Sequence, residues 1–191
     1  MHTRTLHKVA LNGRTSLVAV SVLLGALYAG STIVTPLYPL YQHEFGLSEL
    51  SITLVYATYV VGNLAALFVF GRISDQAGRR PVSLTVLAVS GVSALLFLFA
   101  FHPALLFLGR AASGLAIGVG AATATAWIAD LYGAADKANA SRLAAAVNLA
   151  GLAVGVLAAG LLAQFAPWPL HTVYAVYLLV LVVTAVLTAR T

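Results

Sequence analysis

Residues 71–81 read GRISDQAGRRP, a short charged segment in a chain that is otherwise strongly apolar. The segment carries four formal charges in eleven residues, whereas charged residues make up 8% of the whole chain and apolar residues 61%. This composition lies far outside the range of soluble domains and is typical of an integral membrane protein. The fold then depends on how many membrane-crossing stretches lie on either side of the charged segment.

Six apolar stretches are long enough to cross a membrane, since a helix needs roughly 20 residues to span a hydrocarbon core of about 30 Å. The first stretch is too long for the apolar part of a secretory signal, and we interpret it as a retained helix. The sequence therefore predicts an all-α integral membrane protein with a cytoplasmic N-terminal segment (1–15), a six-helix transmembrane domain (16–189) and a cytoplasmic end (190–191). The predicted helices cover residues 16–40, 51–70, 82–101, 104–129, 141–165 and 170–189.

The basic residues in the connections and at the ends of the predicted helices lie only on one set of alternate connections, which predicts the orientation because Lys and Arg are retained on the cytoplasmic side. The opposite connections contain Glu44 and Glu49 but no Lys or Arg. We expect a multi-pass protein of the inner (plasma) membrane with both termini cytoplasmic. The same distribution accounts for the net charge of +5 without a nucleic-acid partner. The basic residues on these connections and at the adjoining helix ends are Arg4, Lys8, Arg14, Arg72, Arg79, Arg80, Lys137, Arg142 and Arg190.

On the outer side, Tyr38, Tyr41 and Trp168 are expected at the headgroup level, where amphipathic rings are favoured. The charged segment itself is the cytoplasmic link between the second and third helices. Its shortness predicts an antiparallel pair, with glycines at the turn and Pro81 in the first turn of the third helix. Asp75 is expected to accept backbone N–H groups at a helix start or to pair with a neighbouring arginine.

The spacing of Gly71, Asp75, Gly78, Arg79 and Arg80 resembles the signature G-x-L-x-D-R-x-G-R-K/R of the major facilitator superfamily. It departs in having Ile73 for leucine and Gln76 for arginine. The pattern R-x-x-x-G-x-x-x-G at Arg110, Gly114 and Gly118 is similar to the helix-four motif of the same family. The resemblance covers essentially the whole chain, and it implies two inverted three-helix repeats of the family's N-terminal-domain type, as found in bacterial efflux permeases.

The resemblance also implies a gate. In similar transporters, the aspartate of the charged motif contacts a second six-helix half when the protein faces outward. Asp130, at the end of the fourth helix, resembles the acid that pairs with the basic residues of that motif. The implied gating residues are Gly71, Arg72, Asp75, Gly78, Arg79, Arg80 and Asp130.

Arg110 lies roughly 12 Å inside its helix at 1.5 Å per residue, a depth at which a lone cation is costly. We expect it to face a water-filled cavity or a polar partner, with snorkelling to the outer headgroups as the alternative. Similar proteins use this arginine to perturb the protonation of a carboxylate in proton-coupled export, although the six stretches contain no Asp or Glu well inside the membrane. The candidate substrate or proton pathway comprises Arg110, Gly114, Gly118, Tyr28, Asn63 and Asn148.

Tyr28 and the two asparagines have an alternative role as interhelical hydrogen-bond partners. In the fifth helix, Gly151, Gly155 and Gly160 form a small-residue ridge that favours close packing. The ridge also resembles the antiporter motif of the family. That motif usually contains a Gly-Pro pair, and this sequence has Gly155-Val156 at the corresponding positions.

These observations favour a secondary active transporter, as a half or fragment, that moves a small organic solute by alternating access in proton-coupled efflux. Uptake of a sugar or organic acid, and a truncated non-transporting membrane protein, are the alternatives. Family members normally have two six-helix halves, so we expect a second half or a homodimer to complete the substrate site. We expect no enzyme activity, cofactor or metal site, since the chain has no cysteine and its five histidines are scattered.

Overall fold

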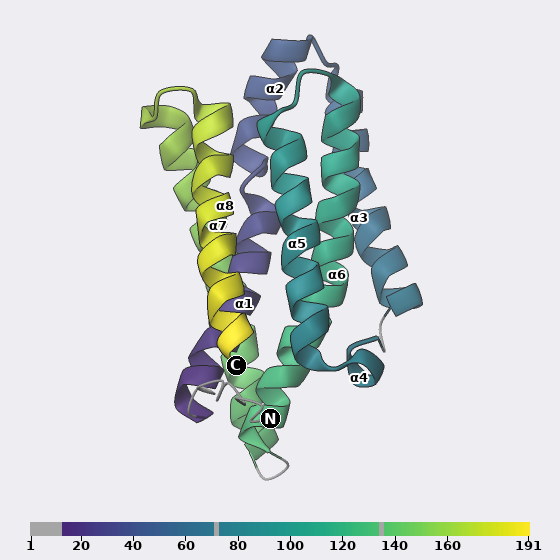
Figure 1. The fold of residues 1–191 in the computed structure, drawn as a ribbon. Helices are drawn as coiled ribbons and strands as arrows, with labels where there is room; N and C mark the ends of the chain where they lie inside the picture. Colours follow the sequence, from purple (N-terminus) through teal and green to yellow (C-terminus); the bar gives the residue numbers. More distant parts are fainter. Residues whose placement is uncertain (1–12, 71–72, 134–135) are drawn as a thin grey trace, which may run out of the picture.

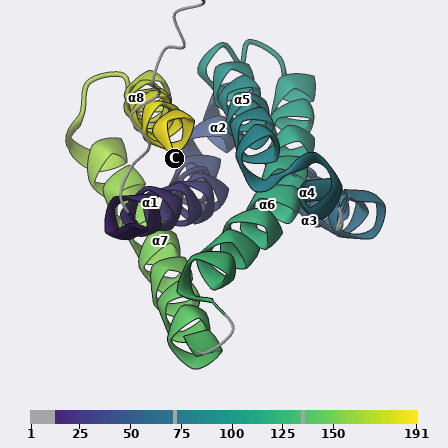
Figure 2. The same ribbon diagram turned by 60° about the horizontal axis from the view of Figure 1, so that its bottom comes forward.

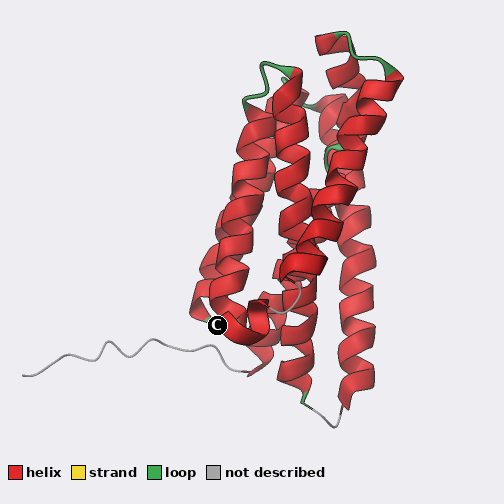
Figure 3. Ribbon diagram, turned by 90° about the vertical axis from the view of Figure 1, so that its right-hand side faces the viewer, coloured by secondary structure: helices red, strands yellow, loops and turns green. Residues whose placement is uncertain are grey.

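The structure is a computed structural model that describes residues 13–70, 73–133 and 136–191. Within these ranges six helices are long and apolar enough to cross a membrane, the first of them interrupted. They run side by side with short connections at both ends of the bundle (Figure 3), and the predicted all-α membrane fold is confirmed. The elements are α1 (Gly13–Thr32), η1 (Thr35–Leu37), α2 (Tyr38–Phe45), α3 (Glu49–Phe70), α4 (Ile73–Ala77), α5 (Arg79–Leu98), α6 (Pro103–Tyr132), α7 (Lys137–Phe165) and α8 (Pro169–Arg190).

The first membrane span combines α1, η1 and α2 and extends to Phe45, past the predicted end at residue 40. Pro36 and Pro39 lack a backbone N–H, so the helix cannot continue unbroken through them. Instead each proline occupies the first turn of a new helical piece, where no N–H is needed. The span ends at Gly46, whose left-handed φ of 62° is open to glycine and whose N–H donates to the Gln42 carbonyl.

Successive spans run in opposite directions, so the connections divide between the two ends of the bundle. The start of α1, the short helix α4 and the end of α8 lie at one end, and α2 lies at the other (Figure 1). Arg14, Arg79 and Arg190 therefore lie at the same end, and Glu44 and Glu49 at the opposite end. The basic and acidic residues thus lie at opposite ends of the bundle, and this separation is the basis for predicting cytoplasmic termini. The orientation in the membrane stays a prediction.

Helix α3 packs against α6, and the antiparallel pair that we expected between the second and third helices is not a packing pair. Glycines at the helix contact explain why α3 packs against α6. A Cβ on Gly62 would lie 2.8 Å from the Ala111 carbonyl oxygen, and one on Gly114 would overlap the Tyr59 carbonyl of α3. The backbones of α3 and α6 thus touch at positions where a larger residue would separate them.

A second glycine contact joins α7 to α1. A Cβ on Gly151 would lie 2.6 Å from the Gly25 carbonyl oxygen, and one on Gly155 would lie 2.7 Å from the Ala29 Cα. Gly160 has no neighbour at this range, so the ridge predicted in the fifth helix has two packing glycines. In both contacts, the second helix of one three-helix group lies on the first helix of the other group, as inverted repeats require (Figure 2).

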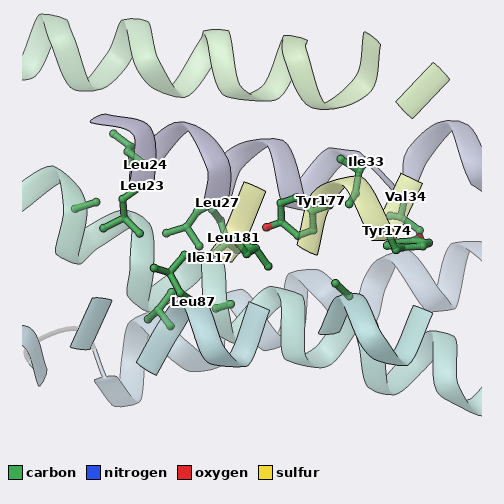
Figure 4. Packing of buried hydrophobic residues seen from close by; sticks show 14 of the residues in the cluster. Leu23, Leu24, Leu27, Ile33, Val34, Leu87, Ile117, Tyr174, Tyr177 and Leu181 are labelled. Atoms are coloured by element: carbon green, nitrogen blue, oxygen red, sulfur yellow. The ribbon is translucent and has the colours of Figure 1, made fainter. Parts of the chain in front are cut away.

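The apolar core lies between α1, α5, α6 and α8 (Figure 4). Leu23 and Leu27 of α1 meet Leu87, Ile117 and Leu181 there. Helices α3 and α7 flank this core, and most of their apolar side chains face outward, Phe68 at 87% exposure and Leu149 at 69% among them.

The outer tyrosines differ from the expected headgroup positions. Tyr41 is buried, because its hydroxyl donates to the Phe97 carbonyl at 3.2 Å and its ring packs against Phe97. Trp168, by contrast, is 79% exposed at the start of α8.

Candidate functional site

Arg110 is the eighth residue of α6, in its third turn, and the structure buries it completely. His102 caps this helix by accepting the Ala104 N–H at Nδ1, and Pro103 occupies its first position. The Arg110 side chain is 1% exposed, which excludes the snorkelling alternative. Its Nη1 donates to the Ser31 carbonyl oxygen at 3.2 Å, so a polar partner is present, as expected from its depth.

Three tyrosine rings surround the Arg110 guanidinium. The Cζ atom lies 4.4 Å from the Tyr59 ring centroid, 5.6 Å from that of Tyr56 and 5.8 Å from that of Tyr38. Each ring face attracts a cation, by about 0.5–2 kcal/mol depending on desolvation. No carboxylate of the described residues lies within ion-pair distance of Arg110. The arginine is therefore a buried cation held by rings and one carbonyl.

Local sequence explains how this cage forms. Ser31 lies in the last turn of α1, just before the proline-interrupted segment, and Tyr38 begins α2 after it. Tyr56 and Tyr59 are three residues apart and so share one face of α3. Gly114, one turn beyond Arg110, lets α3 approach closely enough for these rings to reach the guanidinium.

The remaining pathway candidates lie at two helix contacts. Asn63 lies beside Gly118, where an added Cβ would be 2.8 Å from the Asn63 Oδ1. Tyr28 lies beside Gly151 at the contact of α1 with α7. A Cβ added to Gly151 would lie 3.0 Å from the Tyr28 Cβ. Asn148 is half-buried on α7, and its Oδ1 has no hydrogen-bond partner. The two asparagines thus lie on the two different flanking helices.

The sequence analysis did not include Ser31, Tyr56 and Tyr59 among the site residues. The three-residue spacing of Tyr56 and Tyr59 could have marked them as a pair on one helix face. It could not have shown which helix they face, because that choice depends on the glycine contact between α3 and α6.

At the opposite end of the bundle, Arg79 joins the charged motif to α6. It pairs with Asp75 at 2.6 Å and with Asp130 at 3.0 Å, and its Nη1 donates to the Ser74 hydroxyl at 2.7 Å. The expected pairing of Asp75 with a neighbouring arginine and the pairing of Asp130 with the motif are thus both present. The side chain of Arg79 is 22% exposed and those of the two aspartates are 58% exposed.

The other motif residues set the backbone path. Gly78 precedes α5 with a φ of 92°, a conformation that side chains rarely adopt. Arg80 donates to the Ala189 carbonyl in the last turn of α8, where a cation also complements the helix dipole. Gly71 and Arg72 lie outside the described residues.

Comparison with known proteins identifies the class. The family model described as Major Facilitator Superfamily matches residues 20–191. The match covers nearly all of the chain, and the chain belongs to this family of membrane transporters. Its fold of six membrane-crossing helices is accordingly that of a half of such a transporter.

One relative has a named role. The chain is 33% identical over 138 residues to the puromycin resistance protein pur8 of Streptomyces alboniger. The aligned part is 72% of this chain and 27% of that protein. The chain thus spans about a quarter of the length of the relative that it matches.

Proposed function

We propose that the chain forms one six-helix half of a secondary active transporter that exports a small organic solute by alternating access, driven by a proton gradient. The observation that carries this proposal is Arg110. A cation that is 1% exposed and lacks a carboxylate partner contributes poorly to stability, and such residues in membrane helices typically belong to a substrate or ion path. The resistance role in the name of the relative favours export over uptake.

The transport site needs a second six-helix unit. In the family, solute lies between two halves near the bilayer midplane, and the described residues make up one half. The apolar faces of α3 and α7 are the outward surfaces on which a second unit, either another half or a second copy, would pack. Exposed side chains on these faces include Val61, Phe68, Leu149, Val154 and Leu157.

In this proposal, the cluster of Arg79, Asp75 and Asp130 is one side of the cytoplasmic gate. Its aspartates are more than half exposed, so they are available to a second unit while still paired with Arg79. In this proposal both chain termini lie on the cytoplasmic side, because the basic residues at helix ends, such as Arg14, Arg79 and Arg190, lie at that end of the bundle.

A flux measurement tests the proposal. The purified chain is reconstituted in proteoliposomes, its oligomeric state is determined by chemical cross-linking, and flux of a labelled small organic acid, benzoate, is measured with and without an imposed pH gradient. We expect gradient-dependent flux that is lost in Arg110→Ala and retained in Arg142→Ala, which alters an exposed arginine of α7. A strict monomer without flux would overturn the claim that this chain transports, and unchanged coupling in Arg110→Ala would overturn the role of Arg110.

A further inference from the structure

We propose that Arg110 binds the carboxylate group of a small organic solute. This inference names a solute class for the site described above, and so it rests on the proposed function. It is tested by binding at equilibrium, which does not require transport, so the two can fail separately.

The first step is the unused edge of the guanidinium. Of the three nitrogens, only Nη1 has a hydrogen-bond partner among the described residues, the Ser31 carbonyl. Nε and Nη2 are buried and have none. Their N–H groups lie on the same edge of the planar guanidinium and point in parallel directions, which matches the two oxygens of a carboxylate. A single spherical anion cannot accept both bonds in this geometry as well as a carboxylate does.

The second step is a further unused polar group nearby. The Tyr38 hydroxyl is buried and has no hydrogen-bond partner in the described part of the chain, and the Tyr38 ring centroid lies 5.8 Å from the Arg110 Cζ. A tyrosine hydroxyl can donate one hydrogen bond. Two unpartnered guanidinium nitrogens and one unpartnered hydroxyl therefore lie in the same region of the described structure, and buried polar groups normally have partners.

The third step concerns where the carboxylate comes from. All five acidic residues of the chain lie at helix ends or in connections, and none of them forms an ion pair with Arg110 in the described residues. The described residues therefore leave the guanidinium without an anionic partner, and the carboxylate of a solute is the partner that we propose. The acidic residues are Glu44, Glu49, Asp75, Asp130 and Asp136.

The fourth step is access. Of the three caging tyrosines, Tyr56 is 50% exposed on α3, whereas Arg110 behind it is 1% exposed. Tyr56 is thus a caging ring that also reaches the surface of the bundle, and in this proposal a change of its rotamer admits the solute, as rotamer changes commonly accompany binding. The ring faces of Tyr56 and Tyr59 would then pack against the apolar part of the solute.

Titration of the purified chain in nanodiscs tests the inference, with benzoate as the probe and benzamide and chloride as matched ligands. Benzamide has the shape of benzoate but no charge. Chloride has the same charge as benzoate but lacks the two carboxylate oxygens. We expect isothermal titration calorimetry to give at least tenfold tighter binding of benzoate than of either comparison ligand. Equal affinity for benzoate and benzamide would show that binding depends on ring stacking alone. Equal affinity for benzoate and chloride would show that binding depends on charge alone. Either result, or no binding of benzoate, would overturn the proposal.

Three variants locate the site. Arg110→Lys keeps the positive charge but removes the two parallel N–H donors of the guanidinium. The affinity for benzoate should therefore fall at least tenfold and approach the affinity for chloride. Tyr38→Phe should weaken benzoate severalfold with no effect on benzamide, and Arg142→Gln should change nothing. Unchanged benzoate affinity in Arg110→Lys would place the binding elsewhere and overturn the assignment. If Arg110→Lys does not fold, as judged by size-exclusion chromatography, Tyr38→Phe decides in its place.

Discussion

Arg79 and Arg110 lie at opposite ends of the same bundle and differ in every property that decides what a cation does. Arg79 is 22% exposed and bridges two carboxylates, so its charge is compensated twice. Arg110 is 1% exposed, faces three tyrosine rings and has two nitrogens without a partner. The first arrangement is that of a structural or gating ion pair. The second is a buried charge that the described residues leave incomplete, which points to a ligand.

The two sites also depend on different parts of the fold. Asp75 and Arg79 are four residues apart, so most of that cluster is local. The Arg110 cage draws on α1, α2, α3 and α6, and it depends on how closely α3 approaches α6. Disturbing that helix contact should therefore affect the Arg110 cage and spare the Arg79 cluster.

The largest expected effect is that of Gly114→Leu. A Cβ at this position already overlaps the Tyr59 carbonyl and lies 2.9 Å from the Asn63 nitrogen, so α3 has to move away from α6. We expect a loss of at least about 3 kcal/mol in unfolding free energy, or failure to fold, measured by thermal unfolding in detergent. The control is Gly160→Ala, where no atom lies within 4 Å and the higher helix propensity of alanine should be neutral or slightly stabilising. Equal effects of the two changes would contradict the close contact.

Replacing Arg110 with methionine should separate stability from function. The change removes an uncompensated buried charge, so the free energy of unfolding should stay within about 1 kcal/mol of the unsubstituted protein or rise. Gradient-driven flux and benzoate binding should fall to background in the same variant. Thermal unfolding and the two functional assays check this. A large loss of stability would show instead that Arg110 mainly holds the bundle together.

These contrasts also show what the sequence could predict. The six spans follow from length and composition alone, and the Asp75–Arg79 pair follows from a four-residue spacing. The partners of Arg110 could not be predicted, because Tyr56 and Tyr59 reach it only through a contact between α3 and α6 that sequence neighbours do not specify. The helical continuation from residue 40 to Phe45 was missed for a different reason: it contains polar residues such as Gln42 and Glu44, which are not typical of a membrane-crossing stretch.

A smaller effect is expected from Arg79→Gln. This change removes two ion pairs whose carboxylates are 58% exposed, and exposed pairs contribute little because water and salt screen them. The free energy of unfolding should fall by less than about 1 kcal/mol. Flux should nevertheless fall severalfold if the cluster acts in the gate, whereas Arg142→Gln should leave flux unchanged. Full flux in Arg79→Gln would remove the cluster from the gate.

The smallest effect is the coupling within the Arg79 cluster itself. Asp75 and Asp130 both pair with Arg79, so their single changes to asparagine should not be additive. A double-mutant cycle with Asp75→Asn and Asp130→Asn should give a coupling of about 0.5 kcal/mol in unfolding free energy. Because the aspartates are exposed, that coupling should vanish in about 1 M salt, where the Debye length is about 3 Å. Benzoate binding at Arg110 should withstand the same salt far better, since burial shields that site from screening. If the salt dependence is the same at both arginines, the distinction between an exposed, compensated cation and a buried, incomplete one is wrong.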